Sequence, residues 1–269
     1  MKGVYPTLVK RELWEHRWLW LAPLVTAGIL IVLIVFGVAM ASSKFGGFQG
    51  NWMQQAPRGA MGMRFGLFGL ATQLFSISAL VVVFYLLDCL YAERKDRSIL
   101  FWKSLPVSDF QTVLSKFALA MLILPLGTFL VATVSYPIVY AISAAWLPGY
   151  SELTGGWSFA EWLGAEGLVL GCLVATMLWY APLFAWFMLC SVVSSRSPYL
   201  MASLPIVVLG IGEGLLLHSG HVWRFVFNRM MPIRDVGEGL QRPDLWIGLA
   251  VAAGMLYIVI RLRRYRDDT

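Results

Sequence analysis

Long apolar runs separated by short polar segments dominate the chain. A helix needs roughly 20 mostly apolar residues to cross the hydrocarbon core of a bilayer. The runs predict six membrane-spanning helices, over residues 18–40, 65–90, 117–142, 168–193, 199–217 and 245–260. The sixth run covers only roughly 24 Å at helical rise. We therefore expect Trp246 and Arg261 to anchor it at the interfaces, or the bilayer to thin slightly.

The polar segment before the first run, residues 1–17, predicts an amphipathic helix. Val9 and Leu13 are four residues apart, as are Trp14 and Trp18, so a helix would carry an apolar stripe with a charged back. We expect this helix to lie along the cytoplasmic interface. A plain cytosolic extension of the first spanning helix is the alternative.

The composition agrees with a lipid environment. Apolar residues make up 59% of the 269 residues and charged residues 13%, against roughly 25% charged residues in an average soluble domain. The sequence therefore predicts an all-α, polytopic membrane protein with a single transmembrane domain over residues 1–269. Its three cysteines lie in or beside apolar runs, and we interpret them as small buried side chains rather than disulfide or metal partners.

Basic residues are distributed unevenly among the segments between the runs. Fourteen of the 21 lysines and arginines lie in the N-terminal segment, in residues 91–116, near Arg196 and in the C-terminal tail. Because cytoplasmic segments are enriched in basic residues, both termini and the 91–116 loop are predicted to be cytoplasmic. No basic stripe with interleaved aromatics occurs outside the runs, so the net charge of +6 predicts no nucleic-acid partner.

The densest charge lies in the loop that follows the second run, "YAERKDRSILFWKSLPVSD". Its Glu93–Arg97 cluster cannot re-enter hydrocarbon at acceptable cost. Ser98 predicts the N-cap of a short helix that Pro106 ends, and Ser108 or Asp109 would cap the next helix. The short helix would offer aromatic side chains to a cytoplasmic partner, with charges at the rim. A short interfacial helix that only turns the chain is the alternative.

This segment carries a resemblance to a known family. A span ending in Asp88 and Tyr91, followed by "ERKDRSILFWKSLPVSDFQTVLSK", resembles the first cytoplasmic loop in the membrane subunits of type-2 ABC exporters, bacterial permeases that pair with a separate ATPase. The six-span order, the amphipathic "elbow" at the N-terminus and the apolar stretch before the sixth span are similar too. The resemblance covers nearly the whole chain, although only residues 93–116 are specific.

The resemblance implies that the loop holds a coupling helix seated in a groove of the ATPase. It implies a second permease copy or paralogue as partner, a hydrophobic or amphipathic substrate exported across the bacterial inner membrane, and ATP and Mg used by the ATPase, with no cofactor bound by this chain. Since no glycine loop ending in Lys-Ser or Lys-Thr occurs, we expect a transport subunit and not an enzyme. The implied coupling residues are Glu93, Arg94, Ser98, Ile99, Phe101, Trp102, Lys103, Leu105 and Pro106.

Other functions compete with this hypothesis. A membrane-embedded structural or assembly protein could dock a cytoplasmic partner with the same loop and transport nothing. A gradient-driven carrier usually shows inverted repeats with broken helices and polar residues at mid-membrane, and the chain shows neither pattern.

Few polar residues within the runs suggest chemistry. An intramembrane acid is a functional hypothesis by default, so Glu213 is a candidate for the substrate path or a partner of Arg224 or Arg229. Hydration near the outer interface is the simpler interpretation. His218 and His221 have a spacing compatible with metal ligation, but two histidines without a third strong ligand predict no metal site.

Two further features concern helix geometry. The apolar stretch "VWRFVF", between the last two spans, is too short to cross a bilayer and predicts a half-inserted or interfacial segment. Four prolines inside the runs would kink their helices, and we assign them no role; they are Pro125, Pro137, Pro182 and Pro205.

Overall fold

The computed structural model describes residues 4–45, 60–97, 107–146, 158–233 and 235–265. Helices connected by turns make up these residues, and no strand occurs among them. Six helical segments in this part of the chain are long and apolar enough to cross a membrane. The predicted all-helical fold and its number of spans are confirmed at this level.

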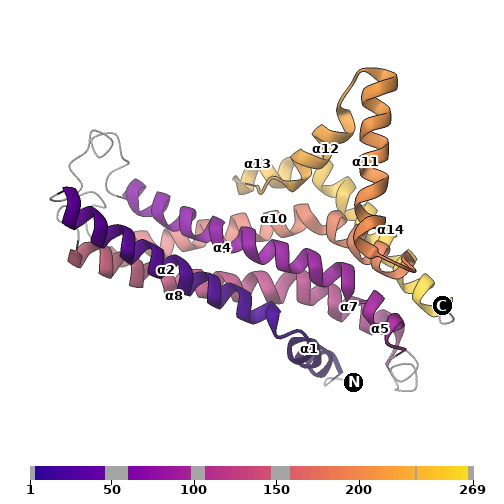
Figure 1. The fold of residues 1–269 in the computed structure, drawn as a ribbon, viewed down its shortest axis with the longest axis horizontal. Helices are drawn as coiled ribbons and strands as arrows, with labels where there is room; N and C mark the ends of the chain where they lie inside the picture. Colours follow the sequence, from indigo (N-terminus) through magenta and orange to yellow (C-terminus); the bar gives the residue numbers. More distant parts are fainter. Residues whose placement is uncertain (1–3, 46–59, 98–106, 147–157, 234, 266–269) are drawn as a thin grey trace. The chain divides into compact units, whose positions relative to one another are not determined.

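The described helices follow one another in the order drawn in Figure 1 and carry its labels. They are α1 (Val4–Glu15), α2 (Trp18–Phe45), α4 (Ala60–Asp88), α5 (Tyr91–Lys95), α7 (Asp109–Ala118), the π-helix η1 (Leu119–Ile123), α8 (Leu124–Trp146), α10 (Phe159–Val193), α11 (Pro198–Leu217), α12 (His221–Met230), α13 (Val236–Gln241) and α14 (Pro243–Tyr265).

The observed spans are longer than the apolar runs that predicted them. The fourth begins at Phe159 rather than at residue 168. The sixth, α14, has 23 residues and covers roughly 34 Å, so the helix is longer than the predicted run of residues 245–260, whose bounds in the membrane stay a prediction. The prediction stopped before the C-terminal arginines, but the helix continues because Arg263 has acidic partners inside the protein.

The chain forms two compact units. The first comprises Met1–Arg17, Val81–Leu124 and Cys172–Thr269, and the second Trp18–Leu80 and Pro125–Gly171. One boundary between the two units lies in the third span, between Leu124 and Pro125. The π-helix η1 ends directly before these two residues. Proline has no N–H to donate, and a wider turn is one way in which a helix accommodates the interrupted hydrogen-bond ladder.

The second unit packs α2 and α8 with most of α4, up to Leu80, and the start of α10. Its buried core includes Ala27, Leu67, Tyr136 and Val169, one from each helix. Within this core the Tyr136 hydroxyl of α8 donates to the Met63 carbonyl of α4 at 3.1 Å.

The first unit joins the end of α4 to the end of α10 and the start of α11. Leu87, Cys190 and Ala202 pack together there, and the Ser191 hydroxyl accepts the backbone N–H groups of Leu90 and Tyr91. Cys89 and Cys190 are buried, as the sequence predicted, whereas Cys172 is of intermediate exposure.

A tight turn in the same unit folds α12 back from the end of α11 (Figure 1). His218 ends α11 in the left-handed conformation with φ 47°. The Trp223 ring then lies against Gly210, where an added Cβ would be 2.6 Å from the indole. The predicted "VWRFVF" segment is therefore helical, and its interfacial position stays a prediction.

Candidate functional site

The candidate site is the region around the predicted coupling loop. Ser98, Ile99, Phe101, Trp102, Lys103, Leu105 and Pro106 lie outside the described residues. Of the implied coupling residues, Glu93 and Arg94 are described, and both face partners within the chain. The structure therefore defines how the two flanks of the loop are held.

Glu93, on α5, is a buried carboxylate on the first flank. Its Oε2 lies 2.9 Å from Arg263 Nη2, and its Oε1 lies 3.1 Å from Lys116 Nζ. Arg11 Nη2 is 3.5 Å from the same Oε1. One acid thus connects α5 to α14, α7 and α1.

Lys116, on the second flank, holds another acid. Its Nζ lies 2.7 Å from Glu12 Oε1, and both side chains are only 1% exposed. Glu12 Oε2 accepts the Tyr85 hydroxyl of α4 at 3.0 Å. Arg263 Nη1 also lies 3.5 Å from Asp109 Oδ1, at the start of α7. We call the connected group the ionic cluster; it consists of Arg11, Glu12, Glu93, Asp109, Lys116 and Arg263.

The ionic cluster contains three acids and three bases, and a fourth acid, the exposed Glu15, lies 3.5 Å from Arg11 Nε at its edge. The pairing of the buried members matters because an unpaired ion in a dry environment costs several kcal/mol, whereas a buried pair with further hydrogen bonds offsets most of that cost. Burial raises the pKa of Glu12, but Lys116 and Arg11 outweigh that effect and lower the pKa from 4.5 to about 2. Glu12 is therefore ionised at neutral pH.

Arg94 attaches the first flank to the end of α10. Its Nη2 donates to the carbonyl oxygens of Ser191 and Ser194, at 2.8 and 2.7 Å. The last carbonyls of a helix have no partner within the helix, and a basic side chain can satisfy them. Its neighbour Lys95 is exposed and is available to solvent.

The second flank begins with a helix cap that the sequence predicted. The Ser108 hydroxyl accepts the Gln111 N–H at 3.2 Å, and the Gln111 side chain accepts the Ser108 N–H at 3.0 Å, which is a complete capping box. Ser108 is therefore the cap of α7, and Asp109 contacts Arg263 instead.

The N-terminal helix α1 turns Leu8 and Glu12 toward the protein interior. Both are buried, whereas Trp14 on α1 is 70% exposed and Trp18, at the start of α2, is 77% exposed. Glu12 was predicted to belong to the charged face of this helix, opposite the apolar stripe. It faces the protein interior instead, because Lys116 and Tyr85 provide its partners there. The position of α1 at a membrane interface stays a prediction.

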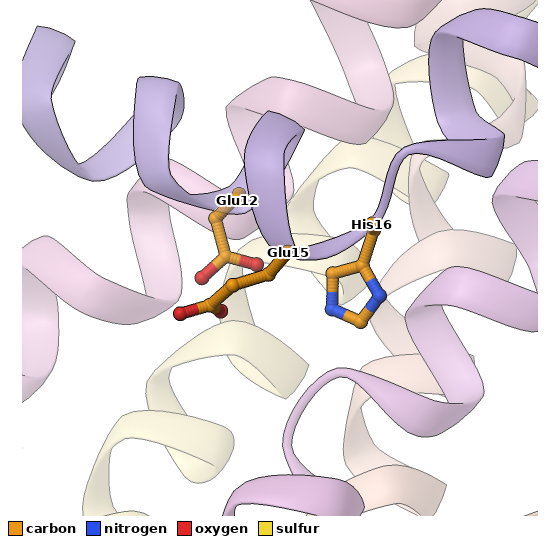
Figure 2. A group of neighbouring side chains, drawn as sticks. All are labelled: Glu12, Glu15 and His16. Atoms are coloured by element: carbon orange, nitrogen blue, oxygen red, sulfur yellow. The ribbon is translucent and has the colours of Figure 1, made fainter.

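One group on α1 has ligand atoms close enough to suggest a metal site. Figure 2 shows Glu12, Glu15 and His16 at its C-terminal end. Both oxygens of Glu12 are already engaged, one by Lys116 and the other by the Tyr85 hydroxyl. The Glu15 carboxylate lies 3.5 Å from Arg11 Nε. The carboxylates of this group are already paired with basic side chains or a hydroxyl, so they are not available to bind a metal ion.

Glu213 has a local structural role. Its carboxylate accepts the Ser219 hydroxyl at 2.6 Å and the backbone N–H groups of His221 and Val222 at 2.7 Å each. These N–H groups belong to the first turn of α12, so the acid ties α11 to α12 at a helix N-terminus, where negative charge is favourable. The expected pairing with Arg224 or Arg229 does not occur among the described residues.

Glu166 is a buried acid that the sequence analysis did not single out. It lies on α10 in the second unit, and its Oε2 accepts the Thr133 hydroxyl of α8 at 3.0 Å. It lies two residues before the predicted fourth span (168–193), so the rule that an acid within a span suggests a function did not select it; the observed helix α10 begins earlier and includes it.

Comparisons with known proteins supply no relative from which function could be inferred: no family model, curated protein or solved structure matches the chain.

Proposed function

We propose that the chain is the membrane permease subunit of a type-2 ABC exporter. It moves a hydrophobic or amphipathic substrate outward across a bacterial inner membrane, pairs with a second copy or paralogue, and uses ATP hydrolysis by a separate ATPase. The resemblance of residues 93–116 and the six helices long enough to cross a membrane support this proposal.

The observation that carries the proposal is the attachment of the 91–116 loop on both sides. The ionic cluster joins α5 before the loop and α7 after it to α1 and α14. Tyr85 connects α4 to the ionic cluster, because its hydroxyl donates a hydrogen bond to Glu12. Because buried ion pairs resist separation, a force applied to the loop is passed to several helices together rather than absorbed by a flexible turn.

The test begins by asking whether a gene for a soluble ATPase lies beside the gene for this chain, and continues with co-expression of that ATPase and reconstitution in lipid nanodiscs. We expect the ATPase to co-purify, and the Phe101→Ala/Trp102→Ala variant to lose it, since aromatic interface anchors often contribute about 2 kcal/mol or more each. The matched control is Phe65→Ala/Trp146→Ala, which removes two exposed aromatics on the predicted opposite side.

An ATPase that binds the wild type and the Phe101/Trp102 variant equally would contradict the coupling role. A partner that binds through the loop but hydrolyses no ATP would support the assembly-protein alternative instead.

A further inference from the structure

A second site lies at the opposite end of α14 from the ionic cluster. A cavity of about 480 Å³ is bounded by α10, α12, α13 and the start of α14. Its walls include the aromatic rings of Trp179 and Phe225 and several charged residues. Cavities of this size and mixed lining are typical of small-molecule and head-group sites.

Arg229 is the unusual member of this cavity. It is only 4% exposed, and its Cζ lies 3.9 Å from the centre of the Trp179 ring. On another side it contacts Gly248 so closely that a Cβ there would lie 1.9 Å from Nη2. The absence of a side chain at Gly248 thus creates the slot that holds the guanidinium.

The hydrogen bonds of Arg229 are incomplete. Nη1 donates to the Asp244 carbonyl at 3.3 Å, whereas Nε and Nη2 have no acceptor within the described residues. Burial lowers the pKa of Arg229, which Asp244 partly opposes, yet arginine stays protonated in proteins. A buried cation with unused donors is costly unless an anion completes it.

The neighbouring charges are mostly engaged. Glu238 pairs with Arg242, and Asp235 accepts the Glu238 N–H as the cap of α13. The Asp244 carboxylate, in contrast, forms no ion pair in the part of the chain that the structure describes, and it is exposed. The cavity wall therefore includes the guanidinium of Arg229 and the carboxylates of Asp235 and Asp244, and Asp244 is the one of these two acids whose carboxylate accepts no hydrogen bond among the described residues.

We propose that this cavity binds the phosphoethanolamine head group of a phospholipid, with the phosphate on Arg229 and the ammonium on Asp244. Arginine binds phosphate oxygens with strong, charge-assisted hydrogen bonds. A ligand with a phosphate alone would meet Asp244 as a like charge, so the cavity selects a zwitterion. Phe225 and Met231 provide apolar contact for the adjoining glycerol and acyl carbons. The site does not depend on the transport proposal, since a chain inactive in export would still bind the head group.

The experiment measures lipid binding to the full-length chain in detergent by native mass spectrometry. The probes are phosphatidylethanolamine, phosphatidylglycerol, water-soluble O-phosphoethanolamine and inorganic phosphate. We expect phosphatidylethanolamine to bind several-fold more tightly than phosphatidylglycerol. Arg229→Gln should raise its apparent Kd about tenfold or more, the effect of losing a charge-assisted hydrogen bond. Arg224→Gln is the matched control, because Arg224 is exposed on the same helix.

Asp244→Asn keeps the proposal testable if Arg229→Gln fails to fold, because the Asp244 side chain is exposed. It should abolish the preference for phosphatidylethanolamine over phosphatidylglycerol. Binding of O-phosphoethanolamine as tightly as the lipid would support the site and identify a soluble ligand as its source. Equal binding of the two lipids by the wild type, or an unchanged preference in Asp244→Asn, would overturn the proposal.

Discussion

Lys116 Nζ lies 2.7 Å from Glu12 Oε1, although 104 residues separate the two along the chain. Both side chains are almost completely buried. The pair joins the N-terminal helix to the helix that follows the predicted coupling loop. Its properties lead to the first two predictions.

Lys116→Met should destabilise the first unit by about 3–5 kcal/mol, because it leaves Glu12 and Glu93 buried without their shared cation. The measurement is the midpoint of thermal unfolding in detergent. Lys95→Met, which removes an exposed lysine nearby, is the matched control and should change the midpoint little. Equal midpoints for the two variants would show that the ionic cluster contributes no stability.

Acid should release α1 in a defined pH range. The pKa of Glu12 is about 2 in the folded chain, against an ordinary 4.5, so its stabilising effect is complete above about pH 4.5 and is lost as the pH falls toward about 2. Hydrogen exchange of the α1 amides, corrected for intrinsic rates, should show constant protection from pH 7 to pH 5 and falling protection below that.

Glu12→Gln is the control for this pH dependence. It should lower the protection of α1 already at neutral pH and flatten the response to acid. Loss of protection between pH 7 and pH 5 in the wild type would mean that another group governs the docking of α1.

The predicted topology follows from the excess of basic residues in four of the segments. In a chain whose native cysteines are replaced by alanine, single cysteines at Ser104 and Asp268 should be shielded from an impermeant thiol reagent in intact cells. A cysteine at Ser151 should react. Labelling of position 104 from outside would reverse the orientation.

Glu213→Gln should leave the α11–α12 turn intact, because the amide oxygen can still accept a backbone N–H. Glu213→Leu removes every acceptor and should expose the N–H groups of His221 and Val222 to hydrogen exchange. Glu238→Leu, which removes an acid paired with exposed Arg242, is the control. Abolished transport in Glu213→Gln with a protected turn would instead place this acid in the substrate path.

The features of the fold that depend on residues close together in the sequence could be predicted from local patterns. The spans follow from apolar runs, and the short polar side chains of Ser108 and Asp109 predicted a cap at one of them; the capping box with Gln111 shows that it is Ser108. The role of Glu213 was missed although its partners are within nine residues, because it requires the left-handed turn at His218.

The ionic cluster could not be predicted in the same way. Glu12 lies among other charged residues and matched a solvent-facing pattern, since its partners Tyr85 and Lys116 are remote in sequence. Arg263 looked like one of several basic residues flanking a short span. Only the folded chain brings Glu93 beside it and allows α14 to extend past the predicted end.

The separation of these partners has a consequence for biosynthesis. Arg263 follows Glu93 by 170 residues, which is about 10–30 s of translation at typical rates. Until α14 emerges and inserts, Glu93 and Asp109 lack one of their cations. A chain interrupted before Arg263 would keep an excess of negative charge at this position, and its loosened α5 and α7 would be accessible to proteases. We therefore expect a newly made molecule to gain resistance to proteases when α14 is in place and Arg263 reaches Glu93.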